Sequence, residues 1–561
     1  MCGLAGWAFP ANSITQADPA ALGAMFDALA ARTGGAALSA VIDEQPRRVV
    51  VLAASIADAA SGVSLALDGA ILNAAELRAQ LARRGHAFRT AGDAELLLRA
   101  YQHWDKELVK QLRGAFAFAL WDARKERLFL ARDRFGQKPL YVQVASGALC
   151  FASEVKALAR APGVTNEVDR EAVGEYLALG YVRGPRTLIR GVRKLAPGTY
   201  ALWQFGSLRE TRYWTPPDAE SALHRSRDGE PVEGFIAQLD EAVQLAMAGD
   251  APAGALLSGG YDSAAIVALM KRHQERVPTF SAGFAGDKHS ELPAAARVAQ
   301  HFGTEHHEIV LDRRELLARL PELVASRDAP FFRPADVALH LLAREAARDV
   351  KVALSGDGGD EVLGGYRRHT VLRSLAPARR RVNGLFVVPV STPAQDGDLD
   401  GGSSALRRIL YYEQVGFLAD NVLERSDRMT VAAALELRTP FVDHKLAEYV
   451  SALPDSARVR GLSTKWILRR ADRRLTDGAL KPRKAGFRID LADLLRAEGR
   501  ELLVEHLRGP GCLTREYYNA AVLDRLLDEH LAVRRNHEEI LWTLLNLEIW
   551  RRIQSTNAPR V

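Results

Sequence analysis

The residues best suited to chemistry lie in a turn rich in glycine and serine. The apolar run Ala255–Leu257 before it has the pattern of a strand, and Ala264–Met270 after it has the pattern of a helix. A turn that opens a helix presents several backbone N–H groups, which attract phosphate oxygens together with the helix dipole. The carboxylate of Asp262 is suited to hold Mg²⁺ against such phosphates. The sequence therefore predicts a nucleotide site that includes Leu257, Ser258, Gly259, Gly260, Asp262 and Ser263.

A second turn carries an unusual density of acidic residues. It follows the apolar run Val350–Leu354, begins with Ser355 and Gly356, and places three acids within five residues: Asp357, Asp360 and Glu361. In a packed domain such a cluster is costly unless a cation or a proton neutralises it. Because parallel strands end at one edge of a sheet, the two turns together predict a site for a magnesium-bound nucleotide.

Short strands alternate with helices in the part of the chain that carries both turns. A helix is predicted at Phe235–Ala248, and further strands are predicted at Thr279–Phe284 and His306–Leu311. Strands that alternate with helices of this length indicate a parallel sheet with crossover helices. Beyond residue 405 the pattern is almost wholly helical. We therefore expect residues 233–561 to form a parallel-sheet α/β domain with a helical C-terminal part.

Residues 1–205 have a different pattern, with strands broken by turns, which indicates an α+β domain. Strands are predicted at Val49–Leu52, Val63–Leu67, Phe116–Trp121, Arg127–Ala131 and Leu140–Val144. Helices are predicted at Ala75–Arg84 and Ala94–His103. Residues 206–232 are polar and irregular, so we interpret them as the connection between two domains.

Composition excludes several classes of protein. The chain has 561 residues, 48% of them hydrophobic and 26% charged, which is typical of a globular protein of more than one domain. No apolar stretch approaches the length of a membrane helix, and the N-terminus has no pattern of a signal peptide. Three widely spaced cysteines indicate a reducing, cytoplasmic setting. The net charge of +6 is spread along the chain rather than gathered on one face, so we expect no nucleic-acid partner.

The N-terminal segment offers a nucleophile. Removal of Met1 would leave Cys2 with a free α-amine. The pKa of such an amine is about 7.7–8.0, so it can take the proton of the thiol near neutral pH. One residue would then supply both a nucleophile and its base.

These segments together resemble the glutamine-hydrolysing asparagine synthetases. The turn Ser258–Ser263 is similar to the pyrophosphate loop of N-type ATP pyrophosphatases, and Ser355–Glu361 is similar to a segment of the synthetase domain. The start Met1–Gly6 resembles class II glutamine amidotransferase domains, which implies an Ntn-hydrolase-like αββα sandwich. Further matches are Gly114–Phe118, Ala131–Gly136, Phe151–Lys156, Asp427–Thr430, Glu436–Asp443, Thr464–Arg469 and Lys481–Phe487.

The resemblance implies an ATP- and Mg²⁺-dependent reaction in two steps. ATP adenylates a substrate carboxylate with release of pyrophosphate, and nitrogen then attacks the acyl-adenylate. Asp262 and Asp360 match the Mg²⁺ ligands, and Lys465 matches a lysine that neutralises the α-phosphate. Asp357 stands where many relatives carry a Glu that is proposed as the base for the attacking ammonia. The resemblance also implies a homodimer, and it implies nucleotide contacts for Leu257, Ala282, Ser355 and Gly356.

The glutamine pocket departs from the pattern of the family. Asp68 replaces the oxyanion-hole Asn, Ala70 replaces the Glu that holds the substrate ammonium, and Leu52–Ile56 lacks the Arg that grips the carboxylate. Loss of one oxyanion-hole donor costs about 3 kcal/mol in the transition state. We therefore expect weak or absent glutamine hydrolysis at Cys2, and nitrogen from glutamine or free ammonia. The residues of this chain at the substrate-binding positions of the pocket are Asp68, Gly69 and Asp93.

Two enzymatic functions remain open. The first is an amidotransferase that adenylates a small-molecule acid or a peptide and transfers nitrogen to it. The second is an amide ligase in which an amine of the substrate attacks, as in β-lactam synthetases and lasso-peptide cyclases, with an inactive glutaminase domain. A non-catalytic scaffold is disfavoured by the intact phosphate and magnesium motifs. In the region where asparagine synthetases form the acceptor site, this chain has Arg333 and two Phe residues. Two interpretations stay open: a site in which Arg333 binds a larger or partly aromatic acid, and a surface loop with a buried Phe.

Overall fold

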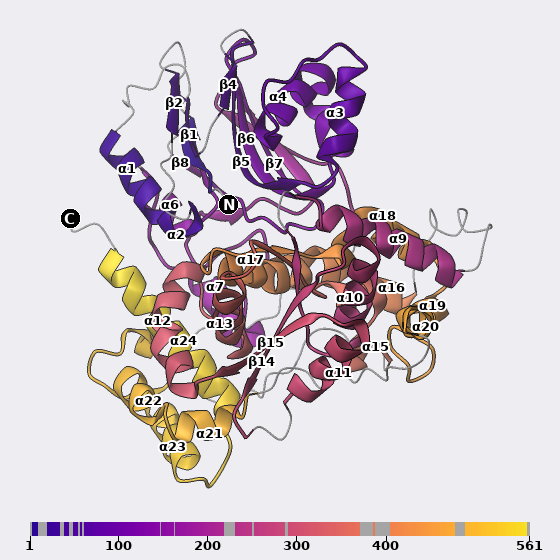
Figure 1. Cartoon of the computed structure of the whole chain (residues 1–561). Helices are drawn as coiled ribbons and strands as arrows, with labels where there is room; N and C mark the ends of the chain where they lie inside the picture. The colour runs from indigo at the N-terminus through magenta and orange to yellow at the C-terminus, as the bar shows by residue number, and fades with distance from the viewer. Residues whose placement is uncertain are drawn as a thin grey trace.

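The computed structural model describes residues 3–8, 19–33, 39–43, 49–53, 56–58, 61–145, 147–161, 163–217, 231–249, 252–286, 290–370, 385–386, 404–476 and 489–557. Figure 1 shows an N-terminal part built on two sheets, which rests on a C-terminal part of one sheet and many helices. Within the described residues, no helix is long and apolar enough to cross a membrane.

The two N-terminal sheets are antiparallel and have six strands each. The first has the order β10-β8-β9-β1-β3-β2, and the second has the order β12-β11-β7-β6-β5-β4. The strands of the first sheet are β1 (Ala5–Ala8), β2 (Ser39–Asp43), β3 (Val49–Ala53), β8 (Tyr141–Ala145), β9 (Ala148–Ala152) and β10 (Arg193–Lys194). Those of the second are β4 (Ile56–Asp58), β5 (Val63–Ile71), β6 (Gly114–Asp122), β7 (Arg127–Arg132), β11 (Thr199–Gln204) and β12 (Ser207–Arg212).

The alternation of side chains along each strand explains why the sheets stack. In β6, Ala117 and Trp121 face the other sheet, while Phe116 and Phe118 face helices α3 (Ala74–Ala82) and α4 (Asp93–Trp104). On the outer face of the first sheet, Trp7 packs near α1 (Pro19–Ala28) and α6 (Val155–Leu158). Helices therefore cover both outer faces, which confirms the predicted αββα sandwich (Figure 1).

The C-terminal sheet is parallel, with the order β15-β14-β13-β16-β17. Its strands are β13 (Gly254–Leu256), β14 (Pro278–Phe284), β15 (Glu305–Leu311), β16 (Val352–Leu354) and β17 (Glu436–Arg438). One face packs against α9 (Pro231–Ala246), α10 (Tyr261–His273), α11 (Leu292–Phe302), α18 (His444–Ala452) and α20 (Trp466–Leu475). The other face packs against α13 (Ala335–Ala346). This confirms the predicted parallel-sheet α/β domain.

The helical C-terminal part packs beside this domain, as the sequence predicts. Its helices are α21 (Leu491–Arg496), α22 (Arg500–Leu507), α23 (Ala520–Leu531) and α24 (Glu538–Asn557), and they bury their apolar faces with α12 (Arg313–Arg327). Figure 1 shows α21, α22 and α23 grouped at the end of the molecule away from the two antiparallel sheets, and α24 running from this group back toward the N-terminal part. The chain has further helices that the description of the site uses: α7 (Arg170–Leu179), α14 (Gly359–Leu363), α15 (Arg367–Thr370), α16 (Ala405–Tyr412), η2 (Glu413–Leu423) and α17 (Glu424–Val431).

Two strands differ from the sequence-based expectation. Residues 207–212, expected to be irregular, form β12, which pairs with β11 as a polar and mostly exposed edge strand. An exposed edge strand needs no apolar alternation, so its sequence resembles a loop. Strand β17 lies in the region expected to be helical. Its three residues are too few to show the alternation of apolar and polar residues that identifies a strand.

Candidate active site

The predicted phosphate loop joins the end of β13 to the start of α10. Gly259 has a φ of +73°, and a Cβ at this position would lie 2.5 Å from the carbonyl carbon of Ala294. Only glycine accepts both conditions without strain. Gly260 then caps α10 in an extended conformation, so the loop enters the helix as the sequence predicts.

Two serine hydroxyls fix the shape of this loop. The hydroxyls of Ser258 and Ser263 lie 3.1 Å apart, and the backbone N–H of Ser258 donates to the hydroxyl of Ser263 at 3.2 Å. The N–H of Gly260 donates to the Ser258 hydroxyl at 3.4 Å. These hydrogen bonds therefore fix one shape of the loop at the start of α10, and a helix N-terminus is a suitable place for phosphate oxygens.

Asp262, Asp360 and Lys465 meet at the carboxyl edge of the parallel sheet. The ammonium of Lys465 lies 2.6 Å from both carboxylate oxygens of Asp262 and 2.7 Å from Oδ1 of Asp360. Burial opposes the charge on Lys465, but the two carboxylates outweigh it, so the pKa of the lysine is raised. Residues 203 positions apart thus form one charged centre.

Small residues make room for this centre. A Cβ at Gly356 would lie 2.6 Å from the Cβ of Asp262, and one at Gly359 would lie 2.6 Å from its Oδ1. A Cβ at Gly365 would collide with both Asp360 and Lys465. The glycines of the second turn therefore bring the carboxylates of two neighbouring strand ends together.

The donor set of this centre fits Mg²⁺. Mg²⁺ is commonly held by one or two carboxylates, with substrate phosphates and water completing an octahedron. Asp262 and Asp360 supply two carboxylates at adjacent strand ends. Within the described residues no cluster of three or more His, Cys, Asp or Glu side chains forms a metal cage. A cation at this edge would thus need oxygens from a bound polyphosphate.

The three acids of the second turn have different partners. Asp357 accepts a hydrogen bond from Ser426 Oγ at 2.5 Å, and Nη2 of Arg425 lies 3.8 Å from its other oxygen. Glu361 is buried and accepts from the hydroxyl of Tyr366. Burial, together with the charge of Asp360, raises the pKa of Glu361 to about 7. Lys465 and Arg425 therefore offset the negative charges of Asp360 and Asp357. At Glu361 the raised pKa favours the protonated acid.

Backbone contacts place the remaining residues predicted to bind nucleotide. The N–H of Leu257 donates to the carbonyl of Phe280 at 2.8 Å, which continues the sheet one residue past β13. The hydroxyl of Ser355 accepts from the N–H of Asp357 at 3.2 Å. Ala282 is buried in the neighbouring strand β14. Leu257, Ser355 and Gly356 thus lie where β13 and β16 end, beside the phosphate loop.

Lys465 has an unusual backbone conformation for a residue with a side chain. It lies at φ 50° and ψ 43°, in the left-handed region, immediately before α20. Such a conformation costs about 1 kcal/mol or more for a non-glycine residue and persists where its surroundings hold it. Here the ion pairs with Asp262 and Asp360 hold the side chain of Lys465, and they thereby stabilise the left-handed conformation of its backbone.

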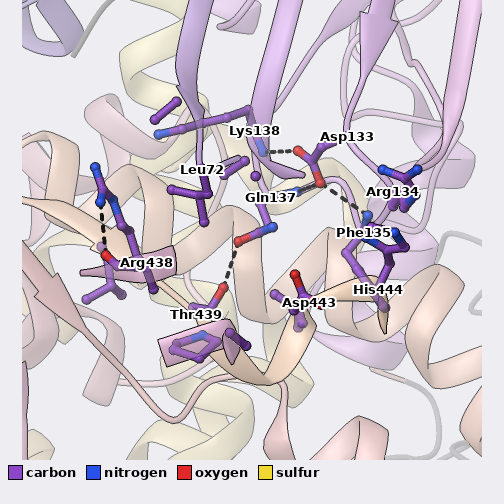
Figure 2. Close-up of a pocket in the computed structure, with 18 of the residues that line it drawn as sticks. Leu72, Asp133, Arg134, Phe135, Gln137, Lys138, Arg438, Thr439, Asp443 and His444 are labelled. Atoms are coloured by element: carbon purple, nitrogen blue, oxygen red, sulfur yellow. Dashed lines mark hydrogen bonds between the residues drawn. The ribbon is translucent and has the colours of Figure 1, made fainter. Parts of the chain in front are cut away.

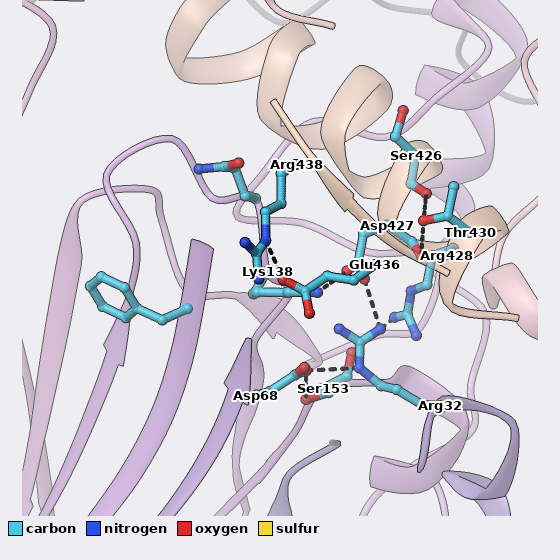
Figure 3. A network of polar contacts seen from close by, with 12 residues as sticks. Arg32, Asp68, Lys138, Ser153, Ser426, Asp427, Arg428, Thr430, Glu436 and Arg438 are labelled. Atoms are coloured by element: carbon cyan, nitrogen blue, oxygen red, sulfur yellow. Dashed lines mark hydrogen bonds and ion pairs between the residues drawn. The ribbon is translucent and has the colours of Figure 1, made fainter. Parts of the chain in front are cut away.

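Asp68 belongs to a buried ion-pair network that joins the N-terminal sheets to α17 (Figure 3). Its carboxylate accepts from Arg32 Nε at 2.7 Å and from Ser153 Oγ at 2.8 Å. Arg32 also donates to Asp427 at 2.7 Å, and Lys138 Nζ lies 2.7 Å from the second oxygen of Asp427. The negative charge of Asp68 is therefore neutralised inside the protein.

The network continues through Arg428. Its guanidinium pairs with Glu154 and donates to the backbone oxygen of Ser153 at 2.9 Å, so it ties α17 to the end of β9. Burial opposes the charge on Asp427, but Arg32 and Lys138 hold the pKa of this carboxyl well below its usual value. The interface between the two parts of the molecule is thus fixed by buried charges of both signs.

Cys2, the predicted nucleophile, lies outside the described residues, but the structure describes two other predicted residues of the glutamine pocket. Asp93 begins α4 and accepts from the N–H of Ile71 at 2.8 Å, and burial raises the pKa of its carboxyl. Gly69 has a φ of +112°, and a Cβ there would overlap the backbone oxygen of Ala115 in β6.

A cavity of about 40 Å³ lies between the sheet that carries Ala70 and the segment that follows β17 (Figure 2). The hydroxyl of Thr439 donates across it to Gln137 at 2.7 Å. The cavity has room for a few water-sized molecules. The pKa of His444, at its rim, is lowered to about 2 by burial and by the charges of Arg134, Arg113 and Lys445. That imidazole is therefore neutral.

Arg333 lies apart from the phosphate loop, at the exposed turn before α13. Its guanidinium carbon is 4.9 Å from the ring centroid of Phe332, and its backbone N–H donates to Asp336 at 3.3 Å. Asp336 in turn pairs with Arg425 at 3.3 Å, and Arg425 faces Asp357. The turn that carries Arg333 is therefore connected to the second acidic turn through two buried or half-buried charges.

Several charged residues of these networks were not predicted from the sequence. Arg32, Lys138 and Arg425 have no spacing that marks them, because charged side chains are mostly exposed and their burial depends on packing between distant segments. The match at Asp427–Thr430 indicated a family segment but not its contacts.

Comparisons with known proteins agree on one family. The family model described as asparagine synthase matches residues 234–552, and the one described as glutamine amidotransferase domain matches residues 1–214. The putative glutamine-hydrolysing asparagine synthetase of Mycobacterium tuberculosis H37Rv is 35% identical, with 87% of this chain and 84% of that protein covered. The glutamine-hydrolysing asparagine synthetase 1 of Bacillus subtilis 168 is 30% identical, with 87% of this chain and 85% of that protein covered. By sequence and by domain content, this chain belongs to the asparagine synthetase family.

Proposed function

We propose that this protein is an AMP-forming ligase, which activates a substrate carboxylate with ATP and converts it into an amide. The observation that carries the proposal is the charged centre of Asp262, Asp360 and Lys465, at the edge where the phosphate loop ends. A carboxylate and a triphosphate repel each other, so a reaction between them needs positive charge at this place.

The first step transfers AMP to the acid. A carboxylate oxygen attacks the α-phosphorus, the bond to the bridging oxygen breaks, and pyrophosphate leaves with the electron pair. Mg²⁺ held by Asp262 and Asp360 would offset the charge of the departing pyrophosphate. The N–H groups of the loop that begins at Ser258 hold its oxygens, and the ammonium of Lys465 neutralises the α-phosphate.

The second step forms the amide. The lone pair of ammonia attacks the acyl carbon, and AMP leaves with the electrons of the broken C–O bond. The nitrogen must lose a proton, and Asp357 is the carboxylate proposed to take it. Ser426 and Arg425 hold that carboxylate in one orientation.

We propose free ammonia as the preferred nitrogen source. The family allows glutamine or ammonia, but Ala70 provides no carboxylate for the ammonium of glutamine. Asp68 is engaged with Arg32, so it provides no donor for an oxyanion. The alternative in which an amine of the substrate attacks is not favoured, because the matched relatives carry the names of glutamine-hydrolysing asparagine synthetases.

The test is direct. Purified protein with ATP and Mg²⁺ is given a panel of carboxylic acids with ammonia or with glutamine, and pyrophosphate, AMP and product mass are measured. We expect acid-dependent pyrophosphate and AMP in equal amounts with ammonia. With glutamine we expect little glutamate beyond that of a Cys2→Ala control. ADP and phosphate in place of AMP and pyrophosphate would contradict the proposal.

A further inference from the structure

Consecutive residues of α17 contact two different parts of the molecule. Ser426 Oγ donates to Asp357 at 2.5 Å, and Nη2 of Arg425 lies 3.8 Å from the other oxygen of the same carboxylate. The next two residues, Asp427 and Arg428, pair with side chains of the N-terminal domain. Little more than one turn of helix therefore joins that domain to the carboxylate proposed as the base.

Three buried cations of the N-terminal domain hold α17. Lys138 Nζ and Arg32 Nη1 each lie 2.7 Å from Asp427, and each pairs with a different oxygen of that carboxylate. Lys194 Nζ lies 3.0 Å from Glu424, the first residue of the helix. The three cations are 1–7% exposed, so water offers their partners little competition. The helix is therefore fixed at two places along its length.

One of these cations also contacts the predicted glutamine pocket. Arg32 Nε lies 2.7 Å from Asp68, the residue at the predicted oxyanion position, while its Nη1 lies 2.7 Å from Asp427 (Figure 3). Asp68 also accepts from Ser153 Oγ at 2.8 Å. A single guanidinium therefore connects strand β5 of the N-terminal domain to the helix that contacts Asp357.

The centre proposed for the first step is supported by other elements. Asp262 lies at the start of α10, Asp360 lies in α14, and Lys465 immediately precedes α20. Their ion pairs, at 2.6 and 2.7 Å, hold these elements together at the edge of the parallel sheet. A displacement of α17 should therefore change the orientation of Asp357 more than it changes this centre.

We infer that the N-terminal domain positions the carboxylate of Asp357 for the amide-forming step, with α17 as the connecting element. Arg32, Lys138 and Lys194 are the positioning residues, because they hold the helix that contacts this carboxylate. Buried ion pairs add orientation more than net stability, and a displacement of about 1 Å in a reacting group can lower a rate by about 100-fold. This inference rests on the proposed function and gives the N-terminal domain a role that needs no glutamine.

The experiment measures the two steps separately on the full-length enzyme. Enzyme in excess is mixed with radiolabelled ATP, Mg²⁺ and the acid of the panel that releases most pyrophosphate, without ammonia, and the acyl-adenylate is measured after acid quenching. Ammonia is then added, and the conversion of the acyl-adenylate into the amide is followed in the same sample. The ratio of the two rate constants does not depend on the fraction of enzyme that is folded.

Two variants remove different contacts of α17. Lys138→Met and Lys194→Met keep the aliphatic stem and remove the charge, so each should slow the amide-forming step by about 10–100-fold and change acyl-adenylate formation little. Lys138→Arg keeps the charge, and the adjoining cavity offers room for the longer side chain, so it should restore most of the second step. Lys125→Met, at a half-exposed lysine 3.3 Å from Asp105, is the matched control and should change neither step.

The outcomes separate this inference from the proposed function. A ratio of rate constants equal to that of the wild type in either methionine variant, whether both steps fall together or neither falls, would overturn the inference and leave the proposed function standing. Should one of these variants yield no folded protein, the other decides. A wild-type enzyme that forms no acyl-adenylate with any acid of the panel would overturn the proposed function and this inference with it.

Discussion

Lys465 links the two strand-end turns through one buried ammonium. Its pairing with Asp262 and Asp360 leaves the centre with two carboxylates and one cation, which is a net negative place suited to receive a divalent metal. The positive charge of the lysine is then available for a phosphate. We therefore propose that the same residue stabilises the turns before ATP binds and neutralises the nucleotide afterwards.

Replacing either carboxylate of this centre should stop the first step of the reaction. We expect Asp262→Asn and Asp360→Asn to lower acid-dependent pyrophosphate release by about 10²–10³-fold, the effect of losing one electrostatic group in a transition state. Asp528→Asn, a surface carboxylate whose side chain is 64% exposed, is the control. Near-wild-type rates in both active-site variants would contradict the assignment.

Asp328 is a buried carboxyl whose ionisation opposes folding. Burial raises its pKa to about 6, above the ordinary value of about 3.9, so between these values the folded protein holds a proton that the unfolded chain has lost. Wild-type stability should therefore fall as the pH rises through this window. Asp328→Asn cannot ionise, so its stability relative to wild type, measured as the free energy of unfolding, should be about 1–3 kcal/mol greater near pH 8 than near pH 4.

Urea unfolding followed by tryptophan fluorescence measures this difference. Asp528→Asn again serves as the control, because it makes the same substitution at a carboxylate that lies at the surface. A difference for Asp328→Asn that is constant across the range would show that Asp328 ionises normally in the folded protein.

At the scale of elements, the phosphate loop depends on close packing between β13, α10 and the start of α11. Gly259 lies against the backbone of Ala294 and Ala295, so the loop shape is set by α11 as much as by its own sequence. This packing explains why a turn of only a few residues keeps one conformation at the place where we propose that phosphate binds.

Gly259→Ala and Gly303→Ala form a matched pair. Both glycines have positive φ, but a Cβ at Gly303 meets nothing within 4 Å, whereas one at Gly259 meets backbone. We expect Gly303→Ala to cost about 1 kcal/mol of stability and to leave ATP affinity unchanged. Gly259→Ala should displace the loop and abolish ATP binding in calorimetry. Equal ATP affinity in the two variants would contradict the role of the loop.

For the whole molecule, the network of Arg32, Asp68, Lys138 and Asp427 fixes the N-terminal sheets on the parallel-sheet domain. Buried ion pairs of this kind add orientation more than net stability, because desolvation offsets most of the attraction. The interface cavity next to the network is small and lined by groups that already have partners, such as Thr439 and Gln137.

Breaking the network at its centre should be costly. Asp427→Ala leaves Arg32 and Lys138 buried with less compensation, so we expect a loss of about 3–5 kcal/mol at neutral pH. Because the pKa of Asp427 is lowered in the folded state, its contribution is present above about pH 4 and is lost as the pH falls further. The difference between variant and wild type should therefore shrink in acid. Glu322→Ala, which removes an exposed partner of Arg319, is the control and should have little effect at any pH.

Most of the fold could be predicted because its signals are local. The strand Val63–Ile71, the helix Asp93–Trp104 and the strand that precedes each glycine turn follow from apolar spacing, and the structure has them within a few residues of the predicted bounds. The strand Ser207–Arg212 was missed since an exposed edge has no such spacing.

The sequence by itself determined the two glycine turns, the acids they carry and the order of strands and helices around them, because each depends on neighbours a few residues away. It also determined the membership of the family. Only the tertiary structure decided which charges become partners: Lys465 with Asp262, and Arg32 with Asp68. Such pairs join residues far apart in the chain, and the free energy that selects them comes from packing and desolvation across the whole molecule, which no local pattern encodes.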